Sequence, residues 1–130
     1  MTTRIELVTT IRAPRRVCFD VARSLDLHVK SLAHTGERAV AGRTSGLIEL
    51  GEEVTWRARH FGLVHHHTSR ITAFAAPAHF RDSMVRGRFR VFEHDHFLPR
   101  GIADRDWKLI EEFAEKAGVR FVRLRQRKVA

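Results

Sequence analysis

Two runs of histidine and acidic residues contain the side chains of this sequence that are best suited to chemistry. The segment FEHDHF (92–97) alternates two acids with two histidines, and HHH occupies 65–67. Imidazole and carboxylate groups bind zinc, and they also transfer protons near neutral pH. Successive residues of a strand point to opposite faces of its sheet, so the strand register decides which of these groups can act together.

A zinc site needs three or four ligands that converge in roughly tetrahedral geometry. A turn at 61–64 would bring His60 opposite His65, with His67 nearby, and these three are the best trio that the sequence offers. Histidines on adjacent strands are also common at a polar rim, and the sequence assigns no fourth ligand. We therefore expect neither a bound metal nor another cofactor.

General acid–base catalysis needs ionisable groups held beside a buried substrate. The candidate proton carriers are His60, His67, Asp82 and Glu93. If Asp82, Glu93 and Asp95 face apolar neighbours, burial raises their pKa. Arginines close in sequence, such as Arg81, can instead hold these carboxylates as ion pairs, and both interpretations stay open.

The N-terminal part of the chain predicts one strand and two short helices. Residues 4–11 alternate in polarity and are rich in β-branched side chains, as in a strand. Pro14 can begin a helix, and Ser24 or Asp26 can cap a second helix in LDLHVKSLAH. The first helix has an apolar stripe that we expect to face inward, formed by Val17, Cys18, Val21, Ala22 and Leu25.

The segment EEVTWRARHFGLVHHHTSRITAFAAP predicts two strands joined by a turn at 61–64. In that register Val54 lies opposite Ile71, and Trp56 lies opposite Ser69. Nearly all apolar side chains then share one face, while arginine, threonine and glutamate share the other. The two strands thus agree on which face is buried.

The segment HFRDSMVRGRFRVFEHDHFL predicts a second hairpin that turns at 86–87. A two-residue turn sets Phe80 against Glu93 and again collects the apolar side chains on one face. This register turns the acids of FEHDHF toward the apolar side and leaves His94 and His96 on the outer face. A β-bulge of one residue would reverse that assignment.

The C-terminal part predicts a helix followed by a strand or a tail. ADRDWKLIEEFAEKAG (103–118) has an inward stripe that includes Trp107 and Ile110, and Gly118 ends it. VRFVRLRQRKVA (119–130) alternates arginines with apolar residues. It is either an edge strand with a basic exterior or a frayed tail.

Length and composition indicate a single folded domain over 1–130. Hydrophobic residues make up 43% of the chain, enough for a core, and there is no long polar tract of the kind that favours disorder. No apolar run forms a signal peptide or approaches the roughly 18 residues of a membrane span, so we expect a cytoplasmic protein. The single cysteine, Cys18, excludes a disulfide within the chain and is expected to be a buried, inert thiol.

The chain is strongly basic, with a formal net charge of +9 and a pI of about 11.3. Such a balance suits nucleic acid, an anionic membrane surface or acidic small molecules. The basic residues are scattered from Arg4 to Lys128, and neither metal-binding fingers nor an aromatic RNA-binding motif accompany them. We therefore do not expect a nucleic-acid partner.

Three segments together resemble the SRPBCC superfamily of START-like proteins, in particular bacterial members of the cyclase/dehydrase or ligand-binding type. They are TTIRAPRRVCFDVARSLDLH, GLIELGEEVTWRARHFG and SRITAFAAPAHFRDSMVRGRFRVFEHDHF. The resemblance implies an α+β helix-grip fold, in which an antiparallel sheet curls around a C-terminal helix and encloses a pocket for a hydrophobic ligand. Family members include lipid-transfer domains and polyketide cyclases, and the fold alone does not choose among them.

The C-terminal part departs from the family pattern. A further strand and a long final helix normally follow a segment like FEHDHF, whereas LPRGIADRDW leads almost at once into a modest helix. The terminal segment could fill the vacant strand position, a partner chain could fill it, or the chain could be a degenerate member. Exposed strand edges favour association, so a homodimer is the expected assembly.

The leading hypothesis is a protein that binds a hydrophobic or amphipathic small molecule. The alternatives are a polyketide-type cyclase or dehydratase, and an interaction protein that has lost its pocket. The residues expected to contact the ligand are Val54, Trp56, Ala58, His67, Ile71, Phe80, Met84, Phe89, Val91, Trp107 and Ile110.

Overall fold

The structure, a computed structural model, describes residues 3–10, 14–98 and 120–127. The chain divides into two compact units, one formed by Pro14–Leu98 and the other containing both ends of the chain. Among the described residues, no helix has both the length and the apolar character that crossing a bilayer requires.

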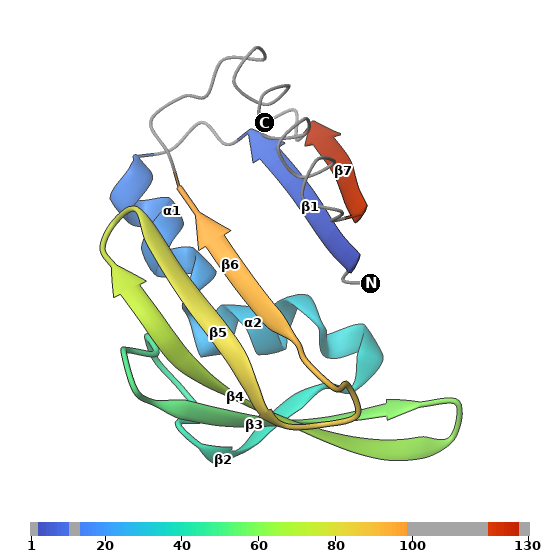
Figure 1. The fold of residues 1–130 in the computed structure, drawn as a ribbon. Helices are drawn as coiled ribbons and strands as arrows, with labels where there is room; N and C mark the ends of the chain where they lie inside the picture. Colours follow the sequence, from blue (N-terminus) through green and yellow to red (C-terminus); the bar gives the residue numbers. More distant parts are fainter. Residues whose placement is uncertain (1–2, 11–13, 99–119, 128–130) are drawn as a thin grey trace. The chain divides into compact units, whose positions relative to one another are not determined.

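The unit Pro14–Leu98 contains two short helices followed by a five-stranded sheet (Figure 1). Its elements are α1 (Arg15–Ala22), α2 (Leu25–Ser31), the 3-10 turn η1 (Ala33–Thr35), β2 (Arg38–Gly42), β3 (Glu53–His60), β4 (Leu63–Ala75), β5 (His79–Arg86) and β6 (Glu93–Phe97). The strands lie in the order β2-β3-β4-β5-β6, and every neighbouring pair is antiparallel. This arrangement confirms the α+β class, with two short helices before an antiparallel sheet. The predicted helix 103–118 lies outside the described residues.

Both helices begin at residues that the sequence suggested. Pro14 precedes α1, and its carbonyl accepts a hydrogen bond from the Cys18 amide at 3.1 Å. Ser24 caps α2, because its hydroxyl accepts from the Leu27 amide at 3.3 Å. Asp26 instead accepts from the Gly46 amide at 2.9 Å and so ties α2 to the segment before β3.

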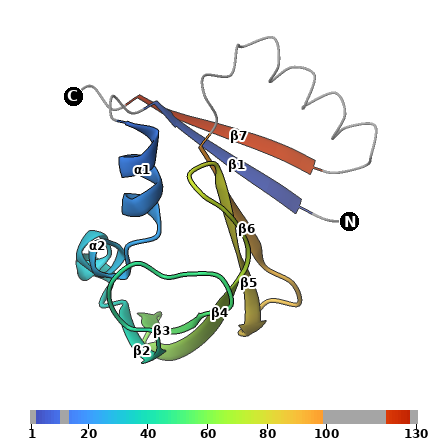
Figure 2. The same ribbon diagram turned by 90° about the vertical axis from the view of Figure 1, so that its left-hand side faces the viewer.

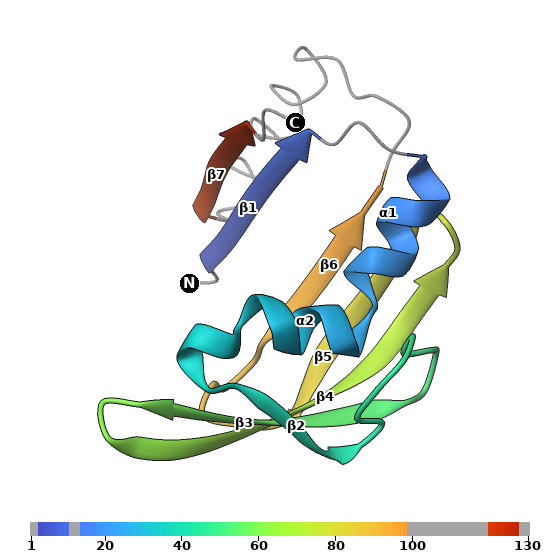
Figure 3. The same cartoon turned by 180° about the vertical axis from the view of Figure 1, so that it is seen from behind.

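The two helices lie on the same face of the sheet, here called the helix-side face (Figures 2 and 3). Phe19 of α1 is fully buried and meets Phe74 and Phe80 edge to face, at centroid distances of 5.4 and 5.5 Å. Around it lie the remaining buried apolar side chains of the described residues, Leu25, Ile48, Val54, Ile71 and Phe80. The helices and the sheet are therefore joined by one aromatic and aliphatic core.

The predicted inward stripe of α1 is wrong in part. Val17 and Val21 are exposed and Cys18 is only half-buried, whereas Phe19 and Arg23 point inward. Arg23 tolerates burial because its guanidinium pairs with the Asp20 carboxylate at 2.9 Å, donates to a backbone carbonyl and lies over an aromatic ring. Helix α1 is thus oriented so that Phe19 is buried, while Val17 and Val21 remain exposed.

The β3–β4 hairpin turns through Phe61 and Gly62, whose φ angles are 52° and 75°. Two successive positive φ angles are typical of a tight type I′ turn, so the four-residue turn predicted at 61–64 is wrong. Trp56 pairs with His67 rather than with Ser69. Because this shift is an even number of residues, every side chain keeps its predicted face.

The β5–β6 hairpin has a different register from the predicted one. β5 continues to Arg86 and β6 begins at Glu93, so the connection covers 87–92 instead of a two-residue turn. Phe80 pairs with His96 rather than with Glu93. This shift is odd, and it therefore moves both histidines of FEHDHF to the helix-side face and both acids to the outer face.

The second unit contains a two-stranded sheet. β1 (Thr3–Thr10) pairs in parallel with β7 (Arg120–Arg127), with Ile5 beside Val122 and Leu7 beside Leu124. The N-terminal strand is confirmed, and the arginine-rich segment is a strand rather than a frayed tail.

Candidate functional site

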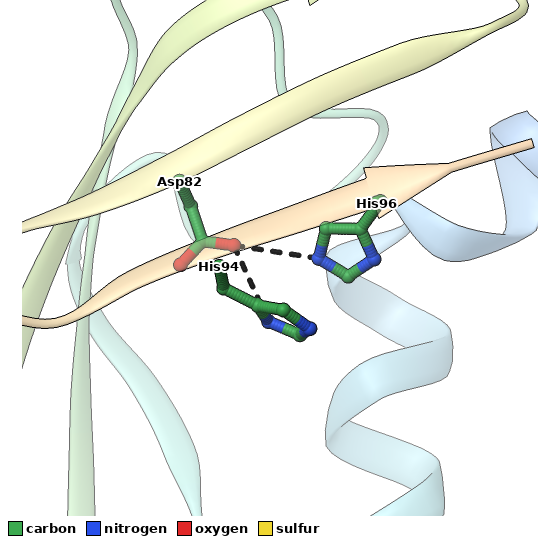
Figure 4. A group of neighbouring side chains, drawn as sticks. All are labelled: Asp82, His94 and His96. Carbon is green, nitrogen blue, oxygen red and sulfur yellow. Dashed lines mark ion pairs between the residues drawn. The ribbon is translucent and has the colours of Figure 1, made fainter. Parts of the chain in front are cut away.

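Asp82, His94 and His96 form a compact cluster on the helix-side face (Figure 4). Asp82 pairs directly with His94 across β5 and β6, and His96 follows two residues later on the same face. The Asp82 Oδ2 atom lies 3.6 Å from His94 Nδ1 and 3.4 Å from His96 Nε2. One carboxylate oxygen thus faces two imidazole nitrogens.

The surroundings of the two imidazoles differ. The His96 ring stacks on buried Phe80 with a centroid distance of 4.2 Å and an interplanar angle of 10°. His94 is 56% exposed at its side chain, and its ring centroid lies 4.0 Å from that of His96. Loss of solvent around the ring, followed by the neighbouring His96, lowers the pKa of His94 despite the attraction of Asp82. The neutral form of His94 is therefore favoured at neutral pH.

The acids of FEHDHF lie on the outer face and are paired there. Asp95 accepts hydrogen bonds from Arg81 Nε at 2.8 Å and Nη2 at 3.0 Å, and His79 contacts the same carboxylate at 2.7 Å. Partial burial acts to raise the pKa of Asp95, but these contacts outweigh it and leave the pKa below its usual value. The prediction that Glu93 and Asp95 face the apolar side is wrong, because these ion pairs hold them on the outer face.

A second polar pair on the helix-side face joins His67 to Ser69, with His67 Nε2 and Ser69 Oγ 3.0 Å apart. The connection 87–92 packs against it. Phe92 meets the His67 ring edge to face at 5.6 Å, and its carbonyl accepts from the Met84 amide at 2.9 Å. A Cβ added at Gly87 would lie 2.6 Å from Met84 Sδ and 2.9 Å from His67 Nδ1. A side chain at position 87 would therefore require Met84 or His67 to shift.

The side of the face nearest β3 is covered by α2. His28 of α2 lies over Trp56, with ring centroids 4.3 Å apart, and its Nε2 contacts Glu37 at 3.1 Å. Trp56 is half-buried as a result. A histidine and an indole thus border the polar groups of the face.

The histidine trio that the sequence analysis considered and set aside does not converge as a set. His60 pairs with Leu63, so it is not opposite His65, although the two rings stack at a centroid distance of 6.0 Å. His67 is bonded to Ser69. Within the described part of the chain, the one group of three potential metal ligands with all ligand atoms within 4.8 Å of one another is Asp82, His94 and His96.

The predicted proton carriers are likewise separated. Asp82 is on the helix-side face and Glu93 on the outer face, where Arg81 lies 3.7 Å from it. Sequence reasoning missed the partners that Asp82 acquires, His94 and His96. The available signal was the His-x-His spacing, which places both imidazoles on one face in any regular strand.

The residues predicted to contact a ligand fall into four groups. Val54, Ile71 and Phe80 belong to the buried core. Half-buried positions on the helix-side face are occupied by Trp56, Ala58, His67 and Met84. Phe89 and Val91 lie in the β5–β6 connection and are 60% and 75% exposed, because that connection is longer than predicted. Trp107 and Ile110 lie outside the described residues.

A separate shallow groove of about 390 Å³ runs between α1 and α2. Its lining consists of Val21, Ala22, Ser24, Leu27, His28 and Ser31. It contains none of the residues predicted to contact a ligand. Comparison with known proteins found no match to this chain among family models, curated proteins or solved structures.

Proposed function

We propose that this chain is a START-like protein that binds a hydrophobic or amphipathic small molecule against the helix-side face of its sheet. One observation carries the proposal, namely the mixture of side chains on that face. Trp56 and Met84 are half-buried beside the polar pair of His67 and Ser69 and beside the cluster around Asp82. A few polar groups set among apolar ones are typical of small-molecule sites.

The two kinds of side chain have different tasks in this proposal. Trp56 and Met84 are half-exposed, and covering them with an apolar surface lowers the free energy of the complex. The imidazoles and Asp82 orient a polar group of the same molecule, and they discriminate against purely hydrocarbon ligands.

Tryptophan fluorescence tests the proposal. The chain has two tryptophans, so Trp107→Phe leaves Trp56 as the sole reporter. Titration with fatty acids and with planar polycyclic phenols is expected to change its emission saturably with at least one class. Met84→Arg, on the helix-side face, should abolish the change, whereas Thr72→Arg, at an exposed position, should preserve it.

Two results together would contradict ligand binding. The first is the lack of any saturable response in the folded Trp107→Phe protein, and the second is the lack of a co-purified lipophilic molecule in native mass spectrometry. A response that Met84→Arg leaves intact and Thr72→Arg removes would place the ligand on the outer face instead.

An enzymatic alternative is favoured by one observation, the Asp82 carboxylate 3.4 Å from the His96 imidazole. Such a pair can exchange a proton with a bound substrate, as a polyketide-type cyclase or dehydratase requires. Turnover of a polyketide-type substrate, lost in Asp82→Asn while the Trp56 response persists, would establish this alternative. Saturable binding without turnover would leave the chain a binding protein.

A further inference from the structure

We propose that Asp82, His94 and His96 bind a divalent transition-metal ion of the zinc class. This site goes beyond the proposed small-molecule binding and does not depend on it. It also departs from the expectation of no metal, which rested on the histidines of β3 and β4.

The separations between the ligand atoms suit an ion placed between them. Ligands about 2.0–2.1 Å from a tetrahedral zinc ion lie about 3.3–3.4 Å from one another. The Asp82 Oδ2 atom lies 3.4 Å from His96 Nε2 and 3.6 Å from His94 Nδ1. Direct hydrogen bonds to nitrogen are normally shorter, about 2.7–3.2 Å. The Asp82 oxygen is thus spaced from both nitrogens as ligands of one ion are, and all three ligand atoms lie within 4.8 Å of one another.

The strand register places the three ligands on one face of the sheet. Asp82 and His94 are direct neighbours across the antiparallel pair of β5 and β6, and His96 is on the same face one alternation further. The stacking of His96 on Phe80, which is 3% exposed, fixes the plane of that imidazole. Sites built on strands with locked side chains bind metals with less ordering cost than sites built on loops.

The charges around the cluster also suit a cation. Within the described residues the ionisable groups in contact with Asp82 are the imidazoles of His94 and His96, so the carboxylate has no arginine there to neutralise it. Asp95, the residue after His94 on β6, differs from Asp82 in this respect, because its carboxylate is paired with Arg81 and His79. The negative charge of Asp82 is therefore available to a metal cation.

Two imidazoles and one carboxylate are a ligand set that zinc and its first-row neighbours accept. Three protein ligands leave at least one coordination position for water or for an oxygen atom of a bound molecule. His94 is 56% exposed, so that position can be reached from solvent at the His94 side of the cluster. The bound ion would thus keep one coordination position at which water and other ligands can exchange.

Calorimetric titration of the untagged 130-residue chain with Zn²⁺ tests the proposal, and Co²⁺ absorbance reports the coordination. We expect one ion per chain with nitrogen and oxygen ligands. Loss of an outer-shell contact alone lowers metal affinity by about 10–100-fold, so His94→Gln/His96→Gln should lower it by more than about 100-fold. Asp82→Asn, which preserves size, should lower it by more than about tenfold.

The matched control is His65→Gln/His66→Gln, which also removes two histidines but takes them from β4, outside the cluster. This variant should bind Zn²⁺ as the wild-type chain does. The proposal is overturned if the folded wild-type chain binds no Zn²⁺, or if the control loses binding while His94→Gln/His96→Gln retains it. Circular dichroism in EDTA checks that each variant folds, and Asp82→Asn alone decides the outcome if the double variant does not.

Discussion

Phe80 and His96 lie opposite each other on β5 and β6, and their rings stack with planes only 10° apart. Because Phe80 also contacts Phe19 of α1, this pair fixes which side of β6 faces the helices. His94 follows His96 onto that side, and Asp95 is left on the other. The stacking of His96 on Phe80 is therefore one of the contacts that decide which side chains of this hairpin lie together.

Truncation of Phe80 should destabilise the unit Pro14–Leu98 strongly. Phe80 is 3% exposed and contacts both Phe19 and His96, so Phe80→Ala leaves a cavity and is expected to cost about 3–5 kcal/mol. Urea unfolding followed by circular dichroism measures the change. Phe89→Ala, at an exposed position, is the control and should stay within about 0.5 kcal/mol of the wild type. Equal losses in the two variants would contradict the assignment of Phe80 to the core.

Arg23 and Arg16 both contact Asp20 but should differ in their contribution to stability. Arg23 is buried and donates to the Ile48 carbonyl at 3.2 Å, so Arg23→Ala leaves a buried acceptor without its donor and should cost about 1–3 kcal/mol. Arg16 is exposed and meets Asp20 at 3.4 Å, and Arg16→Ala should cost less than about 1 kcal/mol. Thermal and urea unfolding of the two variants, compared side by side, measure this difference. A larger loss from Arg16→Ala would refute the inward orientation of Arg23.

Asp20 should contribute to acid unfolding. The hydrogen bond from Arg23 lowers the pKa of Asp20 below its usual value of 3.8, and the charge of Arg16 acts in the same direction. A carboxyl whose pKa is lower in the folded chain stabilises the fold above its unfolded pKa, and this contribution is lost as the pH falls through the folded pKa. Urea midpoints measured from pH 7 down to pH 3 should fall less steeply below pH 4 for Asp20→Asn than for the wild type. Superimposable profiles would show that Asp20 has the same pKa in both states.

Gly36 and Gly42 have nearly the same φ, 69° and 70°, but different surroundings. A Cβ at Gly36 meets nothing within 4 Å, so Gly36→Ala should cost only the left-handed strain of about 1–2 kcal/mol. A Cβ at Gly42 would lie 2.3 Å from the Glu53 carbonyl oxygen, which belongs to the paired strand. Gly42→Ala should therefore be the more destabilising substitution in a melting experiment. The opposite ranking would rule out this pairing of β2 with β3.

Engineered disulfides can test the β5–β6 register directly. Ser83 pairs with Glu93, and paired Cα atoms lie about 4.5–5.5 Å apart, within the range of a disulfide. In a Cys18→Ala background, Ser83→Cys/Glu93→Cys should oxidise to an intrachain bond, as mass spectrometry and thiol titration would report. Ser83→Cys/Arg90→Cys, matched to a two-residue turn at 86–87, should stay reduced. Efficient oxidation of the second pair and not the first would restore the register expected from the sequence.

Local patterns were sufficient to predict the elements of this chain and some of its faces. Alternation in polarity predicted β1 and the strands of both hairpins, and Ser24 predicted the start of α2. In the β3–β4 hairpin the turn was misjudged, yet the faces were right because the error was even. These features depend on residues close together in the chain, so a short stretch of sequence is enough to predict them.

The register of β5 and β6 was decided by contacts between residues far apart. A strand of alternating acids and histidines carries polar groups on both sides, so alternation alone does not choose its face. Two sets of contacts decide which face each side chain takes. Arg81 and His79 pair with Asp95 on the outer face, and Phe80 stacks with His96 on the helix-side face. The sequence by itself determined that strands and two helices form and that two histidines share a face. Only the tertiary structure decided that Asp82 shares it with them, because that depends on the length of the connection 87–92 and on the packing of Phe80.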